Sequence, residues 1–412
     1  MEFFEIYLSR FSKSGKKVTE LSRFKRLCEA LGNPHEYLRF IHVAGTNGKG
    51  SVSEYMAASL IADGQKVGKF TSPYVLKLNE RIMIDYEEID DDALSETMKK
   101  ICRATDKLGE TGYSQFELLT AAAFVYFKEK NLDIVIMEAG IGGLYDCTNI
   151  ITPLVSVISK IDYDHCELLG DTLSQIAAHK AGIIKPGVPC VLYPNEPEAM
   201  EVLENGVASF VKPDVEKLRI NEMSVFGNSF SYDGDAYSTT MGGRHQVMNA
   251  ITAIEALQLL NVSQTSIKRG LNTALLMARM QVISQNPKVI IDGAHNISGV
   301  KAAAELVLRL PCKKVVIFGM LENKDFAGAL EILSDIADEF VLVDDFDPKA
   351  TSRELLLARL SELRFDKKRI RHKNLTDALE FAKKIANGGL VLSSGSLYLS
   401  GKLLRQHRTT HA

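Results

Sequence analysis

The chain lacks a surplus of charge of either sign. Its 412 residues include 49 basic and 52 acidic side chains, which leaves a formal net charge of -3. A protein that attracts nucleic acid or an acidic membrane over a distance needs a strongly basic surface. We therefore expect neither nucleic acid nor a membrane as a partner, and small-molecule chemistry fits the composition better.

Closely spaced cysteines and long apolar runs are also missing. The six cysteines are far apart and form no Cys-x-x-Cys pair, so they suggest neither zinc nor a redox site, and they fit a reducing compartment. No apolar run approaches the roughly 20 residues of a membrane-spanning helix. The first residues include glutamates where a secretory signal carries basic residues. We therefore expect a cytoplasmic protein.

The length and the alternation of patterns predict two α/β domains. A single core rarely grows beyond roughly 250 to 300 residues, so 412 residues favour more than one. Short β-rich runs alternate with amphipathic segments, which predicts a larger N-terminal parallel sheet, P-loop ATPase-like, with helices on both faces. A second series, from Val289 onward, predicts a smaller Rossmann-like doubly wound domain. We place the domains at 1–280 and 288–412, with a linker at 281–287, where the periodicity is lost.

The most informative segment follows the apolar run Phe40 to Val43. It is a glycine-rich turn with one lysine and two hydroxyls, in which backbone N–H groups can face a shared anion before a helix begins. The spacing departs from the general P-loop pattern, and a tight turn without a ligand is the alternative. Lys49 and Ser51, followed by apolar residues at helical spacing, favour a nucleoside triphosphate. The residues of this turn are Gly45, Thr46, Asn47, Gly48, Lys49, Gly50 and Ser51.

Three side chains could hold the Mg²⁺ that phosphate chemistry on an anionic acceptor requires. Ser72 precedes Pro73, Glu138 ends a buried strand before a glycine-rich run, and His165 follows another apolar strand. The alternatives are an ordinary Ser-Pro turn, a buried ion pair and a structural histidine, respectively.

The glycine-rich turn resembles the phosphate loop of the folylpolyglutamate synthases and of the wider Mur ligase family. Further motifs carry the same resemblance along nearly the whole chain. They are Thr71-Ser-Pro73, Asn79-Glu-Arg-Ile82, Phe116-Glu-Leu-Leu-Thr120, Glu138-Ala-Gly-Ile-Gly-Gly143, Asp146-Cys-Thr-Asn149, Asp164-His165, Lys180-Ala-Gly182, Asp292-Gly-Ala-His-Asn296 and Gly395-Ser-Leu-Tyr398.

This resemblance implies an ATP-dependent amide ligase. It would add L-glutamate to the γ-carboxylate of folate polyglutamates through an acyl phosphate, and addition of glutamate to dihydropteroate is a second activity that these residues do not separate from the first. The resemblance also implies two Mg²⁺ ions on Ser72, Glu138 and His165, and a carbamylated Lys180. Lys49, His165 and Lys180 would then be the catalytic residues.

The resemblance also assigns ligand contacts outside the phosphate loop. For the nucleotide it implies Asn249 near the adenine, Arg279 on the phosphates, and Asp292 and His295 from the second domain. For the folate it implies Phe116, Arg81 and Ser396. We expect the protein to be a monomer, and whether it also binds a monovalent cation is left open.

Some of these residues have simpler explanations in the sequence pattern alone. Lys180 could simply be a lysine near the carboxyl end of a helix, and Phe116 could be a core residue at the start of a helix. Asn249 and Arg279 could be polar groups on the surface. Three positions depart from the pattern that we associate with the family, and they bear on the preferred folate form: Ser114, Tyr74 and Leu144.

Two rival functions stay open. One is a Mur-type ligase that adds an amino acid to a peptidoglycan precursor. The other is a binding protein switched by ATP hydrolysis, which would turn over ATP without glutamate.

Overall fold

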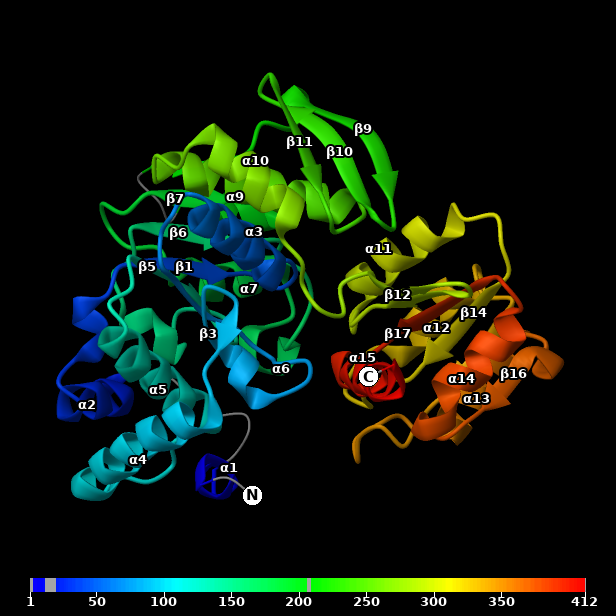
Figure 1. Cartoon of the computed structure of the whole chain (residues 1–412), viewed down its shortest axis with the longest axis horizontal. Helices are drawn as coiled ribbons and strands as arrows, with labels where there is room; N and C mark the ends of the chain where they lie inside the picture. Colours follow the sequence, from blue (N-terminus) through cyan, green and yellow to red (C-terminus); the bar gives the residue numbers. More distant parts are fainter. Residues whose placement is uncertain (1–2, 12–19, 206–208, 412) are drawn as a thin grey trace. The chain divides into compact units, whose positions relative to one another are not determined.

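The chain divides into two compact units in the computed structural model, which describes residues 3–11, 20–205 and 209–411. Unit 1 consists of Met1–Leu218 and Met248–Ala274, and unit 2 of Arg219–Val247 and Leu275–Ala412. Figure 1 shows a helix-covered sheet in each unit. The predicted pair of α/β domains is thereby confirmed.

Unit 1 is built on an eight-stranded sheet in the order β4-β3-β2-β5-β1-β6-β7-β8. The neighbouring pairs from β2 to β8 are parallel, and β3 is antiparallel to β2 and to β4. Every residue of the central strands is buried, because helices cover both faces of the sheet. The strands are β1 (Phe40–Ala44), β2 (Val67–Phe70), β3 (Ile82–Ile84), β4 (Glu87–Glu88), β5 (Ile134–Glu138), β6 (Val155–Ile158), β7 (Cys190–Leu192) and β8 (Phe210–Val211).

Helices of unit 1 pack on this sheet in several groups, and α7 and α8 share a core with β6 and β7. Phe40 and Phe70 share a core with α1, α2, α4 and α5, whereas α10 packs on α3 (Figure 1). The α-helices are α1 (Phe3–Leu8), α2 (Ser22–Ala30), α3 (Lys49–Ala62), α4 (Asp91–Leu108), α5 (Gln115–Glu129), α6 (Cys166–Leu169), α7 (Leu173–Ala181), α8 (Pro197–Asn205), α9 (Arg244–Leu259) and α10 (Gln264–Thr273). Short 3₁₀ helices are η1 (Pro34–Tyr37), η2 (Leu78–Arg81), η3 (Cys147–Ile150) and η4 (Val215–Lys217).

Unit 2 contains a six-stranded sheet in the order β12-β13-β17-β14-β15-β16, parallel except for the edge strand β12. A separate three-stranded sheet is formed by β9, β10 and β11, in which β10 and β11 are antiparallel. The strands are β9 (Leu218–Ser224), β10 (Gly227–Tyr232), β11 (Asp235–Thr239), β12 (Gln281–Gln285), β13 (Lys288–Ile291), β14 (Lys314–Phe318), β15 (Glu339–Leu342), β16 (Ile370–His372) and β17 (Leu390–Ser394). The helices are α11 (Ile297–Leu308), α12 (Phe326–Ser334), α13 (Arg353–Glu362), η5 (Lys367–Arg369), α14 (Leu375–Ala386) and α15 (Leu397–His411).

The segment 281–287 differs from our prediction of a linker. Residues 281–285 form β12, which pairs with β13, and Asn286-Pro287 makes the turn between the two strands. Most residues of β12 are half-buried, so this edge strand shows no clear hydrophobic alternation. Residues 219–247 also group with unit 2. The domain bounds 1–280 and 288–412 stay a prediction.

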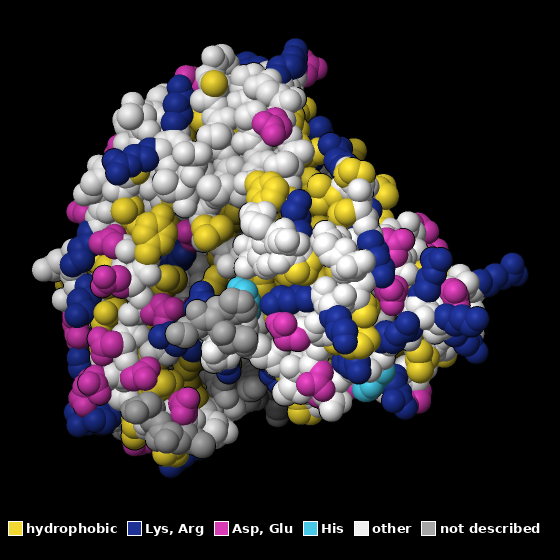
Figure 2. Space-filling view, turned by 45° about the vertical axis from the view of Figure 1, so that its right-hand side comes forward, with side chains coloured by type: hydrophobic (Ala, Val, Ile, Leu, Met, Phe, Trp, Pro, Cys, Tyr) yellow, Lys and Arg dark blue, Asp and Glu magenta, His cyan; other side chains and the backbone are white. Residues whose placement is uncertain are grey.

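The surface and the helices agree with the composition. On the face in Figure 2, basic and acidic side chains both occur across the surface, in line with the small net charge. Within the described ranges, no helix combines the length and the apolar character needed to cross a membrane.

Candidate functional site

The predicted site segments of unit 1 meet at one edge of its sheet. β1 lies between β5 and β6, and β2 lies on the other side of β5, all running in the same direction. The chain therefore leaves the carboxyl ends of these four strands at the same edge, where ligands bind in open α/β sheets. The residues that follow β1, β2, β5 and β6 include the glycine-rich turn, Ser72, the turn after Glu138, and His165.

The glycine-rich turn divides into two parts with different hydrogen bonding. The N–H groups of Thr46 and Asn47 donate to the carbonyl of Lys160, over 2.8 and 3.0 Å. They hold the turn to the segment after β6, so these two amides already have carbonyl acceptors in this structure. The amides from Gly48 to Ser51 lie at the start of α3, where no carbonyl of the same helix can accept them. Amides in this position are suited to an anion, and anion binding by this part of the turn stays a prediction.

Gly48 cannot be replaced without strain. Its φ is 87°, a conformation that favours glycine, and a Cβ there would lie 2.4 Å from Oδ1 of Asn249. Asn249 is buried on α9, and its side chain lies against the glycine-rich turn.

Lys49, Glu138 and Ser72 are neighbours at the strand ends. Lys49 Nζ donates to the carbonyl of Gly45 at 3.1 Å and lies 3.8 Å from Oε1 of Glu138. The other carboxylate oxygen of Glu138 accepts the backbone N–H of Ser72 at 3.3 Å. Glu138 is buried, so these contacts compensate part of the cost of removing its charge from water.

The donor chemistry of this group fits Mg²⁺. A serine hydroxyl and a glutamate carboxylate are hard oxygen donors, which Mg²⁺ prefers. Among the residues that the structure describes, no three His, Cys, Asp or Glu side chains cluster as a metal site.

His165 occupies a more open position. It precedes the short helix α6 with a φ of 53°, and its Nε2 lies 3.8 Å from a carboxylate oxygen of Asp164. Its side chain is 38% exposed, which leaves it accessible to a ligand. The segment shares the sheet edge with Glu138, and a metal-binding role for His165 stays a prediction.

Lys180 is the second lysine of the site, and unlike the half-buried Lys49 it is buried. It lies near the end of α7, is 3% exposed, and donates from Nζ to the carbonyl of Gly45 at 2.8 Å. Burial, together with the charge of Lys49, lowers the pKa of Lys180 to about 7. Both lysines therefore contact Gly45, and a substantial part of Lys180 is neutral near pH 7.

The turn after Glu138 is organised by Asp146, which our list of candidate residues omitted. Its carboxylate is buried and accepts the N–H groups of Gly140 and Ile141 over 3.0 and 3.1 Å. Burial raises the pKa of Asp146, and the hydrogen bonds it accepts oppose that rise. The sequence signal for Asp146 was the short motif Asp146-Cys-Thr-Asn149, which follows a glycine-rich run.

The predicted folate residues of unit 1 lie close to this turn. The Phe116 ring packs on the ring of Phe70, with 5.6 Å between centroids, and a Cβ at Gly140 would lie 2.8 Å from that Phe116 ring. Phe116 therefore lies against the turn that carries Glu138. Arg81 stacks over the ring of Tyr74 at 5.6 Å, in the segment that follows Ser72.

In unit 2, hydrogen bonds to backbone groups connect the segments that carry the predicted site residues. The Asp292 carboxylate, at the end of β13, accepts the N–H groups of Met280 and Ala294, each over 2.9 Å. Burial raises the pKa of Asp292, and the nearby charge of Arg279 opposes the rise. The carbonyl of Ala294 accepts the N–H of Gly395 at 2.9 Å.

The remaining two candidates of unit 2 are in these same segments. His295 Nδ1 lies 2.9 Å from the carbonyl of Gly293, and the buried Ser396 accepts the N–H of Tyr398 at 3.2 Å. Arg279, Asp292, His295 and Ser396 therefore belong to three hydrogen-bonded segments of unit 2.

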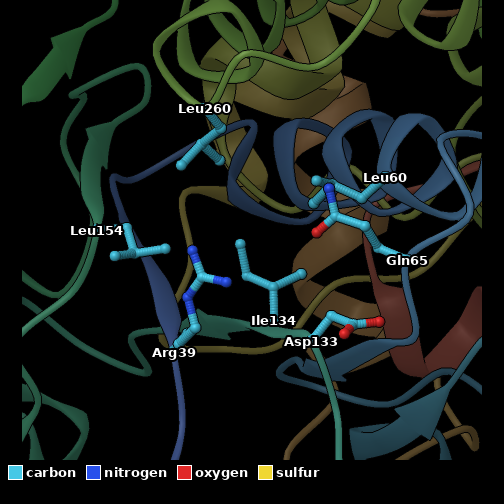
Figure 3. A pocket seen from close by; sticks show the side chains of 7 residues that line it. All are labelled: Arg39, Leu60, Gln65, Asp133, Ile134, Leu154 and Leu260. Carbon is cyan, nitrogen blue, oxygen red and sulfur yellow. The ribbon is translucent and has the colours of Figure 1, made fainter.

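A small cavity lies at the opposite edge of the unit 1 sheet, where the strands begin. Its volume of about 220 Å³ lies below the roughly 300–1,000 Å³ of typical ligand pockets. Figure 3 shows the Arg39 side chain extending between Leu154 and Ile134. This cavity is separate from the strand ends that carry the site. Its lining residues are Arg39, Leu60, Gln65, Asp133, Ile134, Leu154 and Leu260.

Comparison with known proteins gives consistent matches over both units. The model of the Mur ligase middle domain matches residues 43–257, and that of the Mur ligase glutamate ligase domain matches residues 278–397. A dihydrofolate synthase/folylpolyglutamate synthase of Bacillus subtilis (strain 168) is 34% identical over 406 residues, 92% of each chain.

Solved structures match at nearly full length. A Mycobacterium tuberculosis folylpolyglutamate synthase complexed with ADP and AMPPCP has a TM-score of 0.89 at 28% identity, covering 98% of this chain and 97% of that one. Escherichia coli FolC in complex with DHPP and ADP has a TM-score of 0.86 at 27% identity, covering 99% and 98%.

Proposed function

The chain belongs to the folylpolyglutamate and dihydrofolate synthases of the Mur ligase family, and we propose that it is an ATP-dependent ligase that adds L-glutamate to the γ-carboxylate of folate polyglutamates. The observation that carries this proposal is the joint placement of Lys49, Glu138 and Lys180 beside an anion-binding helix start. The relatives supply the substrate class, because their names combine folate with glutamate addition.

The reaction requires two steps that involve the same carboxyl group. A γ-carboxylate oxygen of the folate attacks the terminal phosphorus of ATP, ADP leaves, and an acyl phosphate forms. The amino group of glutamate then attacks the acyl carbon, phosphate leaves, and the lost proton passes to a base or to water. In this scheme the amides from Gly48 to Ser51 and the Lys49 ammonium bind the phosphates and offset the charge that develops on them.

Mg²⁺ would be held by Ser72 and Glu138, with His165 and a carbamylated Lys180 on a second ion. When bound, it supplies positive charge that lowers the repulsion between the folate carboxylate and ATP. Carbamylation requires the neutral amine, which attacks carbon dioxide and then loses a proton. The lowered pKa of Lys180 supplies that neutral form near pH 7, which supports this assignment.

The nucleotide and folate contacts complete the proposal. Asn249, Arg279, Asp292 and His295 would bind the nucleotide, and Phe116, Arg81 and Ser396 the folate. The stacking surface of Phe116 against the turn after Glu138 supports a planar heterocycle near the metal ligands. A cytoplasmic location and a monomeric state belong to the same proposal.

Dihydrofolate synthesis is the second candidate activity. The Bacillus subtilis relative carries both activities in its name, and the Escherichia coli structure holds DHPP with ADP. We therefore propose that dihydropteroate also serves as an acceptor of glutamate.

The test is a set of parallel incubations with MgATP and L-glutamate. Tetrahydrofolate, dihydropteroate and a peptidoglycan precursor are supplied separately, and ADP and the ligated product are measured by chromatography and mass spectrometry. We expect product with the two pterins and ADP release that depends on glutamate. Product with the peptidoglycan precursor alone would reject both folate activities, and ATP turnover independent of glutamate would favour the switched binding protein.

A further inference from the structure

Three buried polar side chains, here called the His42 chain, lie next to the turn that carries Glu138. They are His42 on β1, Thr148 in η3 and Asp146 just before it. His42 and Thr148 are fully buried, and Asp146 is 7% exposed. None of them belongs to the residues proposed above to contact substrate, nucleotide or metal.

The proton positions in the His42 chain follow from the donors available. Thr148 has one hydroxyl proton, and it donates that proton to Oδ1 of Asp146 over 2.6 Å. His42 Nε2 lies 2.9 Å from the same hydroxyl oxygen, so this nitrogen is the donor and the threonine oxygen the acceptor. Nε2 of His42 therefore carries a proton, and the chain runs in one direction from His42 to Asp146. Complete burial lowers the pKa of His42, so the imidazole is neutral.

The Asp146 end of this chain fixes the backbone after Glu138. Oδ2 of Asp146 accepts the amides of Gly140 and Ile141, and the preceding amide of Ala139 donates to Val43 on β1 at 2.9 Å. Three successive amides after Glu138 are thus held, one by β1 and two by Asp146. Glu138 has little freedom to leave its place beside Ser72 and Lys49.

The His42 end of the chain connects this turn to the phosphate loop. His42 lies on β1, which ends at Ala44, and precedes Gly45 of the glycine-rich turn by three residues. On its two sides, the strand is paired with β5, which ends at Glu138, and with β6. The chain therefore links the strand that leads into the phosphate loop to the turn that carries the metal-binding carboxylate.

We propose that His42 and Thr148 are positioning residues, which orient the Asp146 carboxylate so that it fixes the turn from Ala139 to Ile141 and, through it, the Glu138 carboxylate. They touch neither substrate nor metal. The effect on the turn is independent of the reaction, whereas the effect on turnover rests on the function proposed above.

The test compares variants that remove the hydroxyl or the imidazole donor with variants that keep a donor. Thr148→Val removes the hydroxyl with little change in volume, and His42→Leu removes the donor. His42→Gln retains an N–H group at a similar distance from the backbone. Thr105→Val is the matched control, because Thr105 is also a buried, hydrogen-bonded threonine, but on α4.

The first readout is amide hydrogen exchange at residues 139–141 in the protein without ligands. We expect Thr148→Val and His42→Leu to speed exchange at Gly140 and Ile141 by about tenfold, with His42→Gln close to the unmodified protein. Unchanged exchange in Thr148→Val, or the same acceleration in Thr105→Val, would overturn the proposal. So would a His42→Gln variant that exchanges as fast as His42→Leu, since packing volume alone would then explain the result.

The second readout is the Mg²⁺ concentration that gives half-maximal turnover, together with kcat and the KM for glutamate. We expect Thr148→Val to raise the Mg²⁺ requirement about tenfold and to lower kcat, with the KM for glutamate unchanged. Equal losses in all three parameters would indicate general damage and contradict a positioning role. If no folate is ligated at all, the proposed function fails, while the exchange measurement still decides on the His42 chain.

Discussion

The carboxyl edges of the two sheets use their charged side chains in different ways. In unit 1, the ammonium groups of Lys49 and Lys180 both contact the carbonyl of Gly45, beside the start of α3. In unit 2, both oxygens of Asp292 accept backbone N–H groups of its own loops. The first edge gathers two lysines and the amides of a helix start, whereas the second uses its carboxylate to fix its own loops. Substitutions at the two edges should therefore have different consequences.

Loss of the Lys49 charge should have the largest effect. Lys49→Met keeps most of the side-chain volume and removes a positive charge from the phosphates, so we expect turnover to fall by about 10²–10³-fold. The measurement is glutamate-dependent ADP release, with nucleotide affinity determined by calorimetry.

The control for this substitution is Lys66→Met. Lys66 is an exposed lysine near the start of β2, and its Nζ donates to the carbonyl of Lys130. Activity should change little. An equal loss in both variants would contradict a specific role for the Lys49 charge.

Lys180 should give the next largest effect, and the effect should depend on bicarbonate. Removal of dissolved carbon dioxide should lower turnover about tenfold or more, and added bicarbonate should restore it. With a pKa of about 7, the neutral amine is the minor form at pH 6 and the major form at pH 8. Recovery should therefore be more complete at pH 8.

Intact-mass analysis under native conditions provides an independent check on Lys180. It should show the carbamate in the unmodified protein and not in Lys180→Ala. Full activity in carbon dioxide-free buffer, without the carbamate, would show that Lys180 acts as a plain amine.

Apart from its proposed contact with the nucleotide, Asp292 should contribute to the stability of unit 2. Asp292→Ala leaves the amides of Met280 and Ala294 without their acceptor, so we expect the free energy of unfolding to fall by about 1.5–3 kcal/mol. Chemical denaturation of the full chain measures the change. Asp335→Ala, at an exposed position after α12, should change it by less than about 0.5 kcal/mol. An equal loss of stability in Asp292→Ala and Asp335→Ala would contradict a specific role of Asp292 in fixing its edge of the sheet.

The smallest expected effect is the dependence of unit 1 stability on acid pH. Burial lowers the pKa of His42 to about 3, so the folded chain keeps this imidazole neutral while the unfolded chain binds a proton below about pH 6.5. The stability gained from the neutral imidazole is present above pH 6.5 and is lost as the pH falls toward 3. At pH 5.5 the loss is about 1.4 kcal/mol.

His42→Gln should remove this contribution. The variant should show a smaller drop in its unfolding midpoint between pH 7.5 and pH 5.5 than the unmodified chain. An equal drop in both proteins would assign the acid sensitivity to other groups.

Strands and helices with a clear apolar pattern could be predicted from the sequence, whereas strands without such a pattern could not. The strands that hold Phe40 and Val155 are buried on every residue, so their apolar runs were unambiguous. β12 was interpreted as a linker because its half-buried residues show no alternation. The strands β9 to β11 were also missed.

The candidate site shows the same division. Glycines, one lysine and two hydroxyls in one turn predict a phosphate loop from the sequence alone. The hydrogen bonds from the amides of Thr46 and Asn47 to the carbonyl of Lys160 could not be predicted, because Lys160 lies more than a hundred residues away along the chain. His42 was missed for a related reason, since a histidine in an apolar run carries no sign of its hydrogen-bond partner.

The sequence by itself determined the kind of chemistry, because residue types and local spacing decide which groups can bind phosphate or metal. Tertiary structure alone decided which of these groups meet, and how buried each one is. The lowered pKa of Lys180 and the fixed turn after Glu138 both depend on burial and on partners distant in sequence. Neither property is local, so only the folded chain could reveal it.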